Sequence, residues 1–205
     1  MGALTEVFVL PGRRIVLRET APEDALLYLS WLQNGVFRRY RPGLEFLLKD
    51  AEIVREFLAW RRGLVPAPEI EVWVYRKGEF CPRGLMGLLG LDYWHRKGEA
   101  VAIFSGLAPR ERLEALWLLL EGGFSHLRLE KIFFQVRETE RRFLHFLEKV
   151  GLRPEAYLAK EGRDPETGLR YGVYRFAIFP ETLEKFKDLI PIPLPRLSSK
   201  GETSF

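Results

Sequence analysis

The segment from residue 98 to residue 152 constrains the fold more than any other part of this chain. It alternates between two short apolar runs and two helical patterns. The apolar runs are residues 100–104 and 132–136, and the pattern between them has apolar side chains at helical spacing from Pro109 to Leu127. A strand, a long helix and a second strand normally form a parallel crossover. A further helix ends at Gly151.

The preceding residues predict a different arrangement. A strand is expected at 14–18, a helix that Thr20 or Ala21 precedes and Pro22 opens, and a second helix capped by Asp50. Residues 70–75 and 85–93 then show strand patterns, and the Lys97-Gly98 turn leads to residues 100–104. Three neighbouring strands with short connections favour an antiparallel meander.

Two last strands, at 153–160 and 169–178, flank a turn signal at 164–168. The whole pattern predicts a single α/β (α+β) domain over residues 1–180, with a mixed, mainly antiparallel sheet flanked by helices. Residues 181–205 are expected to form a C-terminal extension with a short helical patch and a proline-rich tail that favours extended backbone.

Composition narrows the class of protein. The chain has 205 residues, of which 47% are hydrophobic, and a net charge of +4 spread among glutamates. A nucleic-acid partner is not expected, because such proteins gather their positive charge on one face. No apolar run has membrane-spanning length and no signal-peptide pattern is seen, so we expect a cytoplasmic protein. Abundant Arg with few Asn and Gln favours a thermophilic source.

Metal binding is not expected either. His95, His126 and His145 lack metal-ligand spacing, and Cys81 is the single cysteine. No Cys/His pair is legible, so Cys81 is interpreted as a loop residue. His95 is a weak candidate for a general base.

Four segments carry a resemblance to a known family: residues 14–24 (RIVLRETAPED), 31–42, 124–132 (FSHLRLEKI) and 148–152 (EKVGL). In this order they resemble the GNAT superfamily of acetyl-CoA-dependent N-acetyltransferases. The pattern is most similar to the branch that acts on the N-termini of ribosomal proteins. The resemblance covers roughly residues 13–180 and implies transfer of an acetyl group from acetyl-CoA to a primary amine, such as a protein N-terminus.

The resemblance also implies site residues. Glu99 lies where relatives place a carboxylate that removes a proton from the amine, although a solvated acid after a turn would give the same pattern. Ile103, Phe104 and Ser105 would contact the cofactor at the end of their strand. Arg110 and Arg112 would supply positive charge to its phosphates.

The cofactor loop departs from the family pattern, which has glycines where the pyrophosphate is bound. If Arg110 takes the first position, Leu113 and Ala115 stand at the positions of the small residues. Pro109 removes one N–H from the helix start. The family's usual Asn and Tyr on the last helix are replaced by Glu140 and Leu147.

A second hypothesis therefore stands beside the enzyme. The chain would be a GNAT-like binding module that has lost acetyl-CoA binding, whose tail docks on a partner or on a second copy, as in a homodimer. Two further groups could belong to an acceptor site. Arg38, Arg39 and Arg41 would favour an acidic acceptor unless they form a solvated loop, and Tyr93 and Trp94 could line its mouth.

Overall fold

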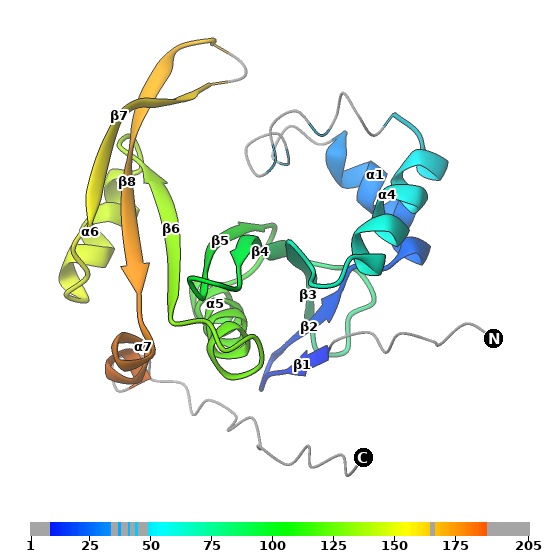
Figure 1. The fold of residues 1–205 in the computed structure, drawn as a ribbon, viewed down its shortest axis with the longest axis horizontal. Coiled ribbons are helices and arrows are strands. Elements are labelled where there is room, and N and C mark those ends of the chain that lie inside the picture. Colours follow the sequence, from blue (N-terminus) through cyan, green and yellow to red (C-terminus); the bar gives the residue numbers. More distant parts are fainter. Residues whose placement is uncertain are drawn as a thin grey trace.

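In the computed structural model, the residues described are 9–33, 37, 41, 44, 49–164 and 167–187. They form one mixed sheet of eight strands, in the order β1-β2-β3-β4-β5-β6-β8-β7 (Figure 1). Every neighbouring pair is antiparallel except β5 and β6, which are parallel. The strands are β1 (Val9–Pro11), β2 (Ile15–Glu19), β3 (Ile70–Arg76), β4 (Gly84–Asp92), β5 (Lys97–Phe104), β6 (Lys131–Arg137), β7 (Ala156–Arg163) and β8 (Arg170–Ile178).

Helices cover both faces of the sheet. The described helices are a 3₁₀ turn (Pro22–Asp24), α1 (Ala25–Leu32), α4 (Ala51–Gly63), α5 (Pro109–Ser125), α6 (Arg141–Lys149) and α7 (Pro180–Lys187). The fold class expected from the sequence is confirmed, as are the antiparallel meander and the parallel β5–α5–β6 unit.

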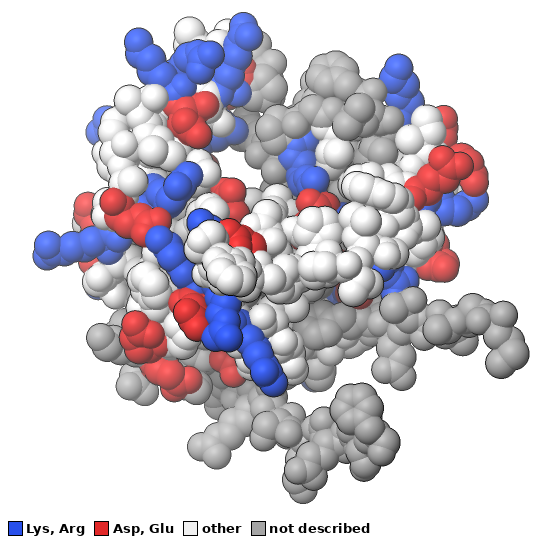
Figure 2. Space-filling model, in the orientation of Figure 1, with Lys and Arg blue, Asp and Glu red and all other residues white. Residues whose placement is uncertain are grey.

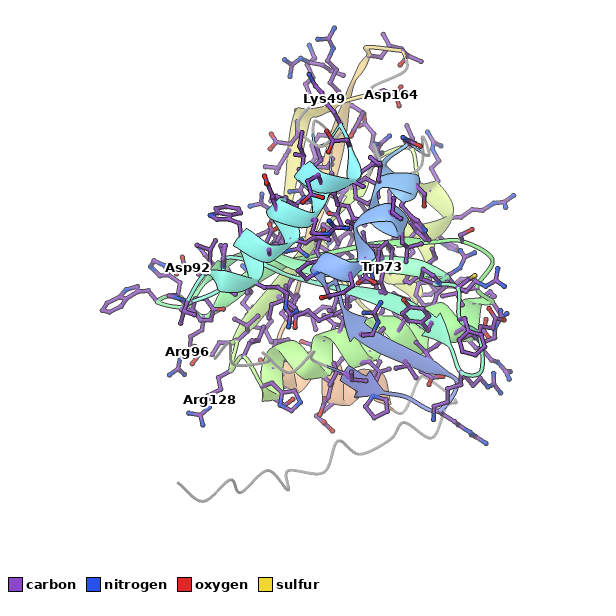
Figure 3. The ribbon with its side chains drawn as sticks, turned by 90° about the vertical axis from the view of Figure 1, so that its right-hand side faces the viewer. Lys49, Trp73, Asp92, Arg96, Arg128 and Asp164 are labelled. Atoms are coloured by element: carbon purple, nitrogen blue, oxygen red, sulfur yellow. The ribbon has the colours of Figure 1, made fainter. Side chains whose placement is uncertain are left out.

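Three buried clusters hold these layers together, and the two described below lie on opposite faces of the sheet. Helix α5 packs on one face through Trp117, Leu118 and Leu119, which meet Val72, Val74 and Met86 of the sheet. Leu183 of α7 belongs to the same core. On the opposite face, Tyr28, Val54 and Leu58 of α1 and α4 pack on Trp73 and Leu85. Trp73 lies in the middle of this face in Figure 3.

Local signals placed the helix ends correctly. Asp50 accepts hydrogen bonds from the N–H groups of Glu52 and Ile53, both at 3.0 Å, as a cap should. Pro109 begins α5, and Gly151 follows α6 with φ of 81°, a left-handed conformation that glycine adopts without strain. Asn34 and Gly35, whose residue types predict the end of the first helix, lie outside the described residues.

Three expectations were wrong in detail. Strand β1 was not foreseen, although it extends the sheet by pairing with β2. The spacing of Leu26, Leu29 and Leu32 predicts that all three lie on the inner stripe of α1, but Leu26 is 72% exposed, because Ala25 and Tyr28 take inner positions. Lys97 and Gly98 belong to β5 rather than to the turn before it, since Gly98 pairs with Ile132 of β6. None of the described helices has the length and apolarity needed to cross a membrane.

Candidate functional site

The two parallel strands at the centre of the sheet pair over only three residues. Glu99 is opposite Phe133, and beyond this pair β5 and β6 have no ladder partners on the sides that face each other. Figure 1 shows the strands separating there, so that β6, β8 and β7 form an arm that diverges from the rest of the sheet. Each strand therefore leaves a row of unpaired backbone N–H and C=O groups along the opening, to which an extended ligand can hydrogen-bond.

Side chains of β5 alternate between the two faces of the sheet. Ala100, Ala102 and Phe104 pack against the α5 core. Val101 and Ile103 pack against the core beneath α1 and α4, and Glu99 shares their face because strand side chains repeat every two residues. Two of the predicted contact residues, Ile103 and Phe104, thus point to opposite faces, and both are half-buried.

Glu99 lies at the point where the strands separate. Its carboxylate is half-buried and bonds the side chain of Gln135 on β6. Burial raises the pKa of Glu99, and the charge of Arg175 and the bond to Gln135 offset part of that rise. A carboxylate with a raised pKa is a better proton acceptor than an ordinary surface glutamate. These surroundings favour a role as proton acceptor over that of a fully solvated acid.

Arg175 and Gln135 were not identified from the sequence. Arg175 of β8 is directly opposite Gln135 of β6, so both lie on the face that carries Glu99. The Arg175 guanidinium lies 5.1 Å from the centre of the Phe133 ring. The alternation of strand 131–137 could have placed Phe133 and Gln135 on one face, but the register that brings Arg175 beside them comes from β8.

The β5–α5 junction is the place expected to bind phosphates. Gly106 has φ of 70°, and the N–H groups of Gly106, Leu107 and Arg110 have no backbone or side-chain acceptor among the residues that the structure describes. Ser105 is exposed, and its N–H donates to the carbonyl of Arg83. Three unpaired N–H groups at a helix start provide part of an anion site.

A carboxylate already lies at this helix start. Glu111 accepts a hydrogen bond from the Ala108 N–H at 2.8 Å and forms an ion pair with Arg76 of β3. The Arg76 guanidinium also donates to the carbonyl of Gly106 at 3.3 Å. The bond to Arg76 lowers the pKa of Glu111, so this carboxylate stays charged. It competes with a phosphate for the helix N-terminus.

The predicted arginines reach different positions. Arg110 is exposed, whereas Arg112 folds back and donates from Nε to the carbonyl of Leu107 at 2.9 Å. Leu107 is buried in the α5 core, and Leu113 is half-buried on the helix. Arg83 lies 3.7 Å from the position that a Cβ on Gly106 would take. The junction thus has more positive than negative side chains within reach.

The opposite wall of the opening, below α1 and α4, holds a buried group of charges. Glu71 of β3 accepts hydrogen bonds from Arg41 at 3.2 Å and from the Tyr28 hydroxyl at 2.9 Å, and is ion-paired with Arg61 of α4. Arg41 also pairs with Glu69 at 2.8 Å. Arg41 is therefore not a solvated loop residue. Arg38 and Arg39 lie outside the described residues.

The other candidates lie away from the opening. Tyr93, Trp94 and His95 are in the β4–β5 turn, at the end of β5 where pairing with β6 begins, and Trp94 is 90% exposed. The ring of His95 bonds Asp92, which neighbours Arg96 at that edge in Figure 3.

The structure describes no cluster of three potential metal ligands in the ranges given above, and Cys81 is exposed. Leu147 belongs to α6 and is buried in a cluster with Val136 and Phe176.

The surface reflects this arrangement. Figure 2 shows it hollowed between the β7–β8 arm and the α1–α4 end, with Lys and Arg gathered on the tip of the arm. Exposed Lys160, Arg163 and Arg170 belong to that tip. The hollow therefore lies between a basic arm and a wall whose described charges are paired.

Comparison with known proteins shows the fold. No family model matches this chain, and no curated protein matches it. Among solved structures, a spermidine/spermine N-acetyltransferase from Vibrio cholerae, in complex with manganese ions, superposes with a TM-score of 0.67 at 20% identity. The alignment covers 86% of this chain and 95% of that one.

A second structure is a spermidine N-acetyltransferase from Vibrio cholerae in complex with CoA and spermine. Its TM-score is 0.65 at 20% identity, with 83% of this chain and 98% of that chain covered. The chain therefore has the GNAT fold, and the similarity extends over nearly the whole of these acetyltransferases.

Proposed function

We propose that this protein transfers an acetyl group from acetyl-CoA to a primary amine, with a protein or peptide N-terminus as the preferred acceptor. The observation that carries the proposal is the separation of β5 from β6 immediately after Glu99. It leaves an unpaired strand edge next to a half-buried carboxylate of raised pKa. Acetyltransferases of the same fold include one that was solved with CoA and spermine.

The residues present fit acetyl-CoA at both ends. The amide groups of its extended arm would pair with the free edge of β5 near Ile103, Phe104 and Ser105. Its pyrophosphate would lie at the unpaired N–H groups of the β5–α5 junction, with Arg110 and Arg112 beside it. When bound, acetyl-CoA supplies the activated acyl group as a thioester.

Glu99 would act on the acceptor. The uncharged amine attacks the acyl carbon, a C–N bond forms and the C–S bond breaks, and the surplus N–H proton passes to Glu99 directly or through water. The departing thiolate takes its proton from water, because Leu147, where relatives place a tyrosine, is buried in the core. The chemistry therefore needs one well-placed carboxylate on this chain.

A second candidate function is a binding module without acetyl-CoA. The position of Glu111 favours it, because that carboxylate and Arg76 occupy the start of α5. In that case the opening and the C-terminal extension would serve protein contacts, including contacts with a second copy.

The test is release of free CoA thiol from acetyl-CoA in the presence of a short peptide with a free N-terminus. Wild type is expected to show peptide-dependent release, and Glu99→Gln should lower kcat about a hundredfold, as loss of a general base does. Glu161→Gln, at an exposed position on β7, is the matched control and should match wild type. Absence of peptide-dependent release, or equal rates for wild type and Glu99→Gln, would contradict the proposal.

A further inference from the structure

Arg175 is a cation that acts on Glu99 through its charge but forms no direct ion pair with it among the described residues. Its guanidinium forms no hydrogen bond or ion pair among the residues that the structure describes, and its buried Nε lacks an acceptor. It rests over the Phe133 ring, at a centroid distance of 5.1 Å. A buried donor without an acceptor is costly unless a ligand supplies one.

Three other arginines around the opening, among the residues that the structure describes, already have carboxylate partners. Arg41 and Arg61 pair with Glu69 and Glu71 beneath α1 and α4. Arg137, on the face of β6 that carries Gln135, lies 3.5 Å from Asp164 and 4.3 Å from the centre of the Tyr171 ring. Arg175 differs from them, because its strand neighbours on this face are Gln135 and Ala156.

The carboxylates of the opening are also engaged. Glu69 and Glu71 face guanidinium groups at hydrogen-bonding distance. Glu99 remains, and it would be occupied with the reacting amine. A polyamine carries further ammonium groups that need anionic partners, and it would instead meet the positive charge of Arg175. The described residues therefore disfavour a polycationic acceptor.

We propose that Arg175 is a specificity-determining residue that binds the oxygen next to the acceptor amine, so that the site selects α-amino acyl compounds over polyamines. This inference rests on the proposed function. In an α-amino acyl compound, a carbonyl or carboxylate oxygen lies two bonds beyond the carbon that carries the amine. With the amine at Glu99, this oxygen faces the Gln135 and Arg175 side of the opening. A guanidinium is a suitable donor for such an oxygen.

The experiment compares four acceptors with saturating acetyl-CoA: alanine tripeptide amide, free alanine, propylamine and spermidine. Replacing Arg175→Gln should lower kcat/KM for the tripeptide about tenfold or more, mainly through KM. Measured at a pH above the acid limb, where Glu99 is ionised in both proteins, the same change should leave propylamine unaffected, because that amine has no oxygen. It should raise kcat/KM for spermidine. Tripeptide and free alanine distinguish a peptide carbonyl from a carboxylate as the bound group.

Controls separate specificity from folding. Arg170→Gln, at an exposed position of the same strand, should behave as wild type with all four acceptors. Arg175→Lys keeps the charge and should restore part of the preference, which a merely structural loss would not do. Titration of the N-acetylated tripeptide in the presence of CoA gives a binding measurement that is independent of turnover.

Two results would overturn the inference while leaving the acetyltransferase intact. One is wild-type turnover of spermidine at or above the tripeptide rate. The other is an Arg175→Gln variant that is folded and has an unchanged tripeptide-to-propylamine ratio. Absence of transfer to every acceptor, together with absence of CoA binding, would instead contradict the proposed function itself.

Discussion

Glu99 gains its chemical character from its surroundings more than from its position in the chain. Burial removes part of its water, whereas the hydrogen bond to Gln135 and the charge of Arg175 favour its ionised form. Burial remains the larger effect, so its pKa is raised. This balance leads to two predictions at the scale of single residues.

The first prediction concerns rate and pH. The acid limb of kcat/KM should follow deprotonation of Glu99 and lie above the ordinary glutamate pKa of about 4.3. Arg175→Gln removes a charge that lowers the pKa of Glu99, so this limb should move to higher pH. Steady-state rates from pH 4 to 9 measure both shifts. If the acid limb of Arg175→Gln lies at the same pH as that of wild type, the charge of Arg175 does not affect the pKa of Glu99.

The second prediction concerns stability. Because the folded pKa of Glu99 is raised, the native state binds more protons than the unfolded chain between the two pKa values. Its stability should fall as pH rises through that window. Glu99→Gln lacks this dependence and should be more stable than wild type at pH 8 by at most about 1 kcal/mol, because solvent screens part of the effect. Urea unfolding of both proteins at pH 4 and pH 8 tests this prediction. The same difference in unfolding free energy between Glu99→Gln and wild type at both pH values would contradict it.

At the scale of elements, the start of α5 decides between the two candidate functions. The side chain of Glu111, within the first turn of α5, accepts a hydrogen bond from the N–H of Ala108, the residue that precedes the helix. The ion pair with Arg76 ties the helix start to β3. A phosphate arriving there meets one resident negative charge and several arginines.

Replacing Glu111→Gln tests this balance. The amide keeps an oxygen for the Ala108 N–H but removes the charge, so affinity for CoA should rise roughly threefold to tenfold. Loss of the ion pair with Arg76 should lower the urea midpoint only slightly, because Arg76 is partly exposed and keeps Glu79 as a partner. Calorimetric affinities and urea midpoints report the two effects separately. If affinity falls instead, Glu111 supports the cofactor site and does not compete with it.

Helix α4 is fixed to the sheet by the Arg61–Glu71 pair, which is nearly free of solvent contact. Without Arg61 the buried Glu71 keeps only Arg41 and the Tyr28 hydroxyl among its described partners, so Arg61→Met should destabilise the protein by about 3 kcal/mol, the lower end of the cost of breaking a buried pair. Arg55→Met removes an exposed pair on the same helix and should cost less than about 1 kcal/mol. Chemical denaturation of both variants measures the contrast. Similar midpoints would show that the buried pair contributes little.

Sequence patterns predicted these elements because the relevant forces are local. The Asp50 cap, the Pro109 start and the Gly151 end depend on residues within one helical turn. The contacts that define the site join distant segments. Glu111 meets Arg76, and Arg175 comes beside Glu99 through the register of β8 on β6. Neither pairing leaves a periodic signal in the sequence.

At the scale of the whole molecule, the sheet is divided by its single parallel junction. One part carries α1 and α4, the other forms the β7–β8 arm, and the hollow in Figure 2 lies between them. The parallel junction was expected from two apolar runs that flank one long helix pattern. The neutral and basic lining of the hollow was not, since it depends on which charges pair across the fold.

The central claim is that this divided sheet binds acetyl-CoA, and calorimetric titration of the purified protein with acetyl-CoA, with free CoA in parallel, tests it most directly. We predict micromolar binding of both, with positive side chains and the unpaired N–H groups of the β5–α5 junction replacing the missing glycines. No detectable heat and no thermal shift at millimolar ligand would contradict the account and leave the binding-module function.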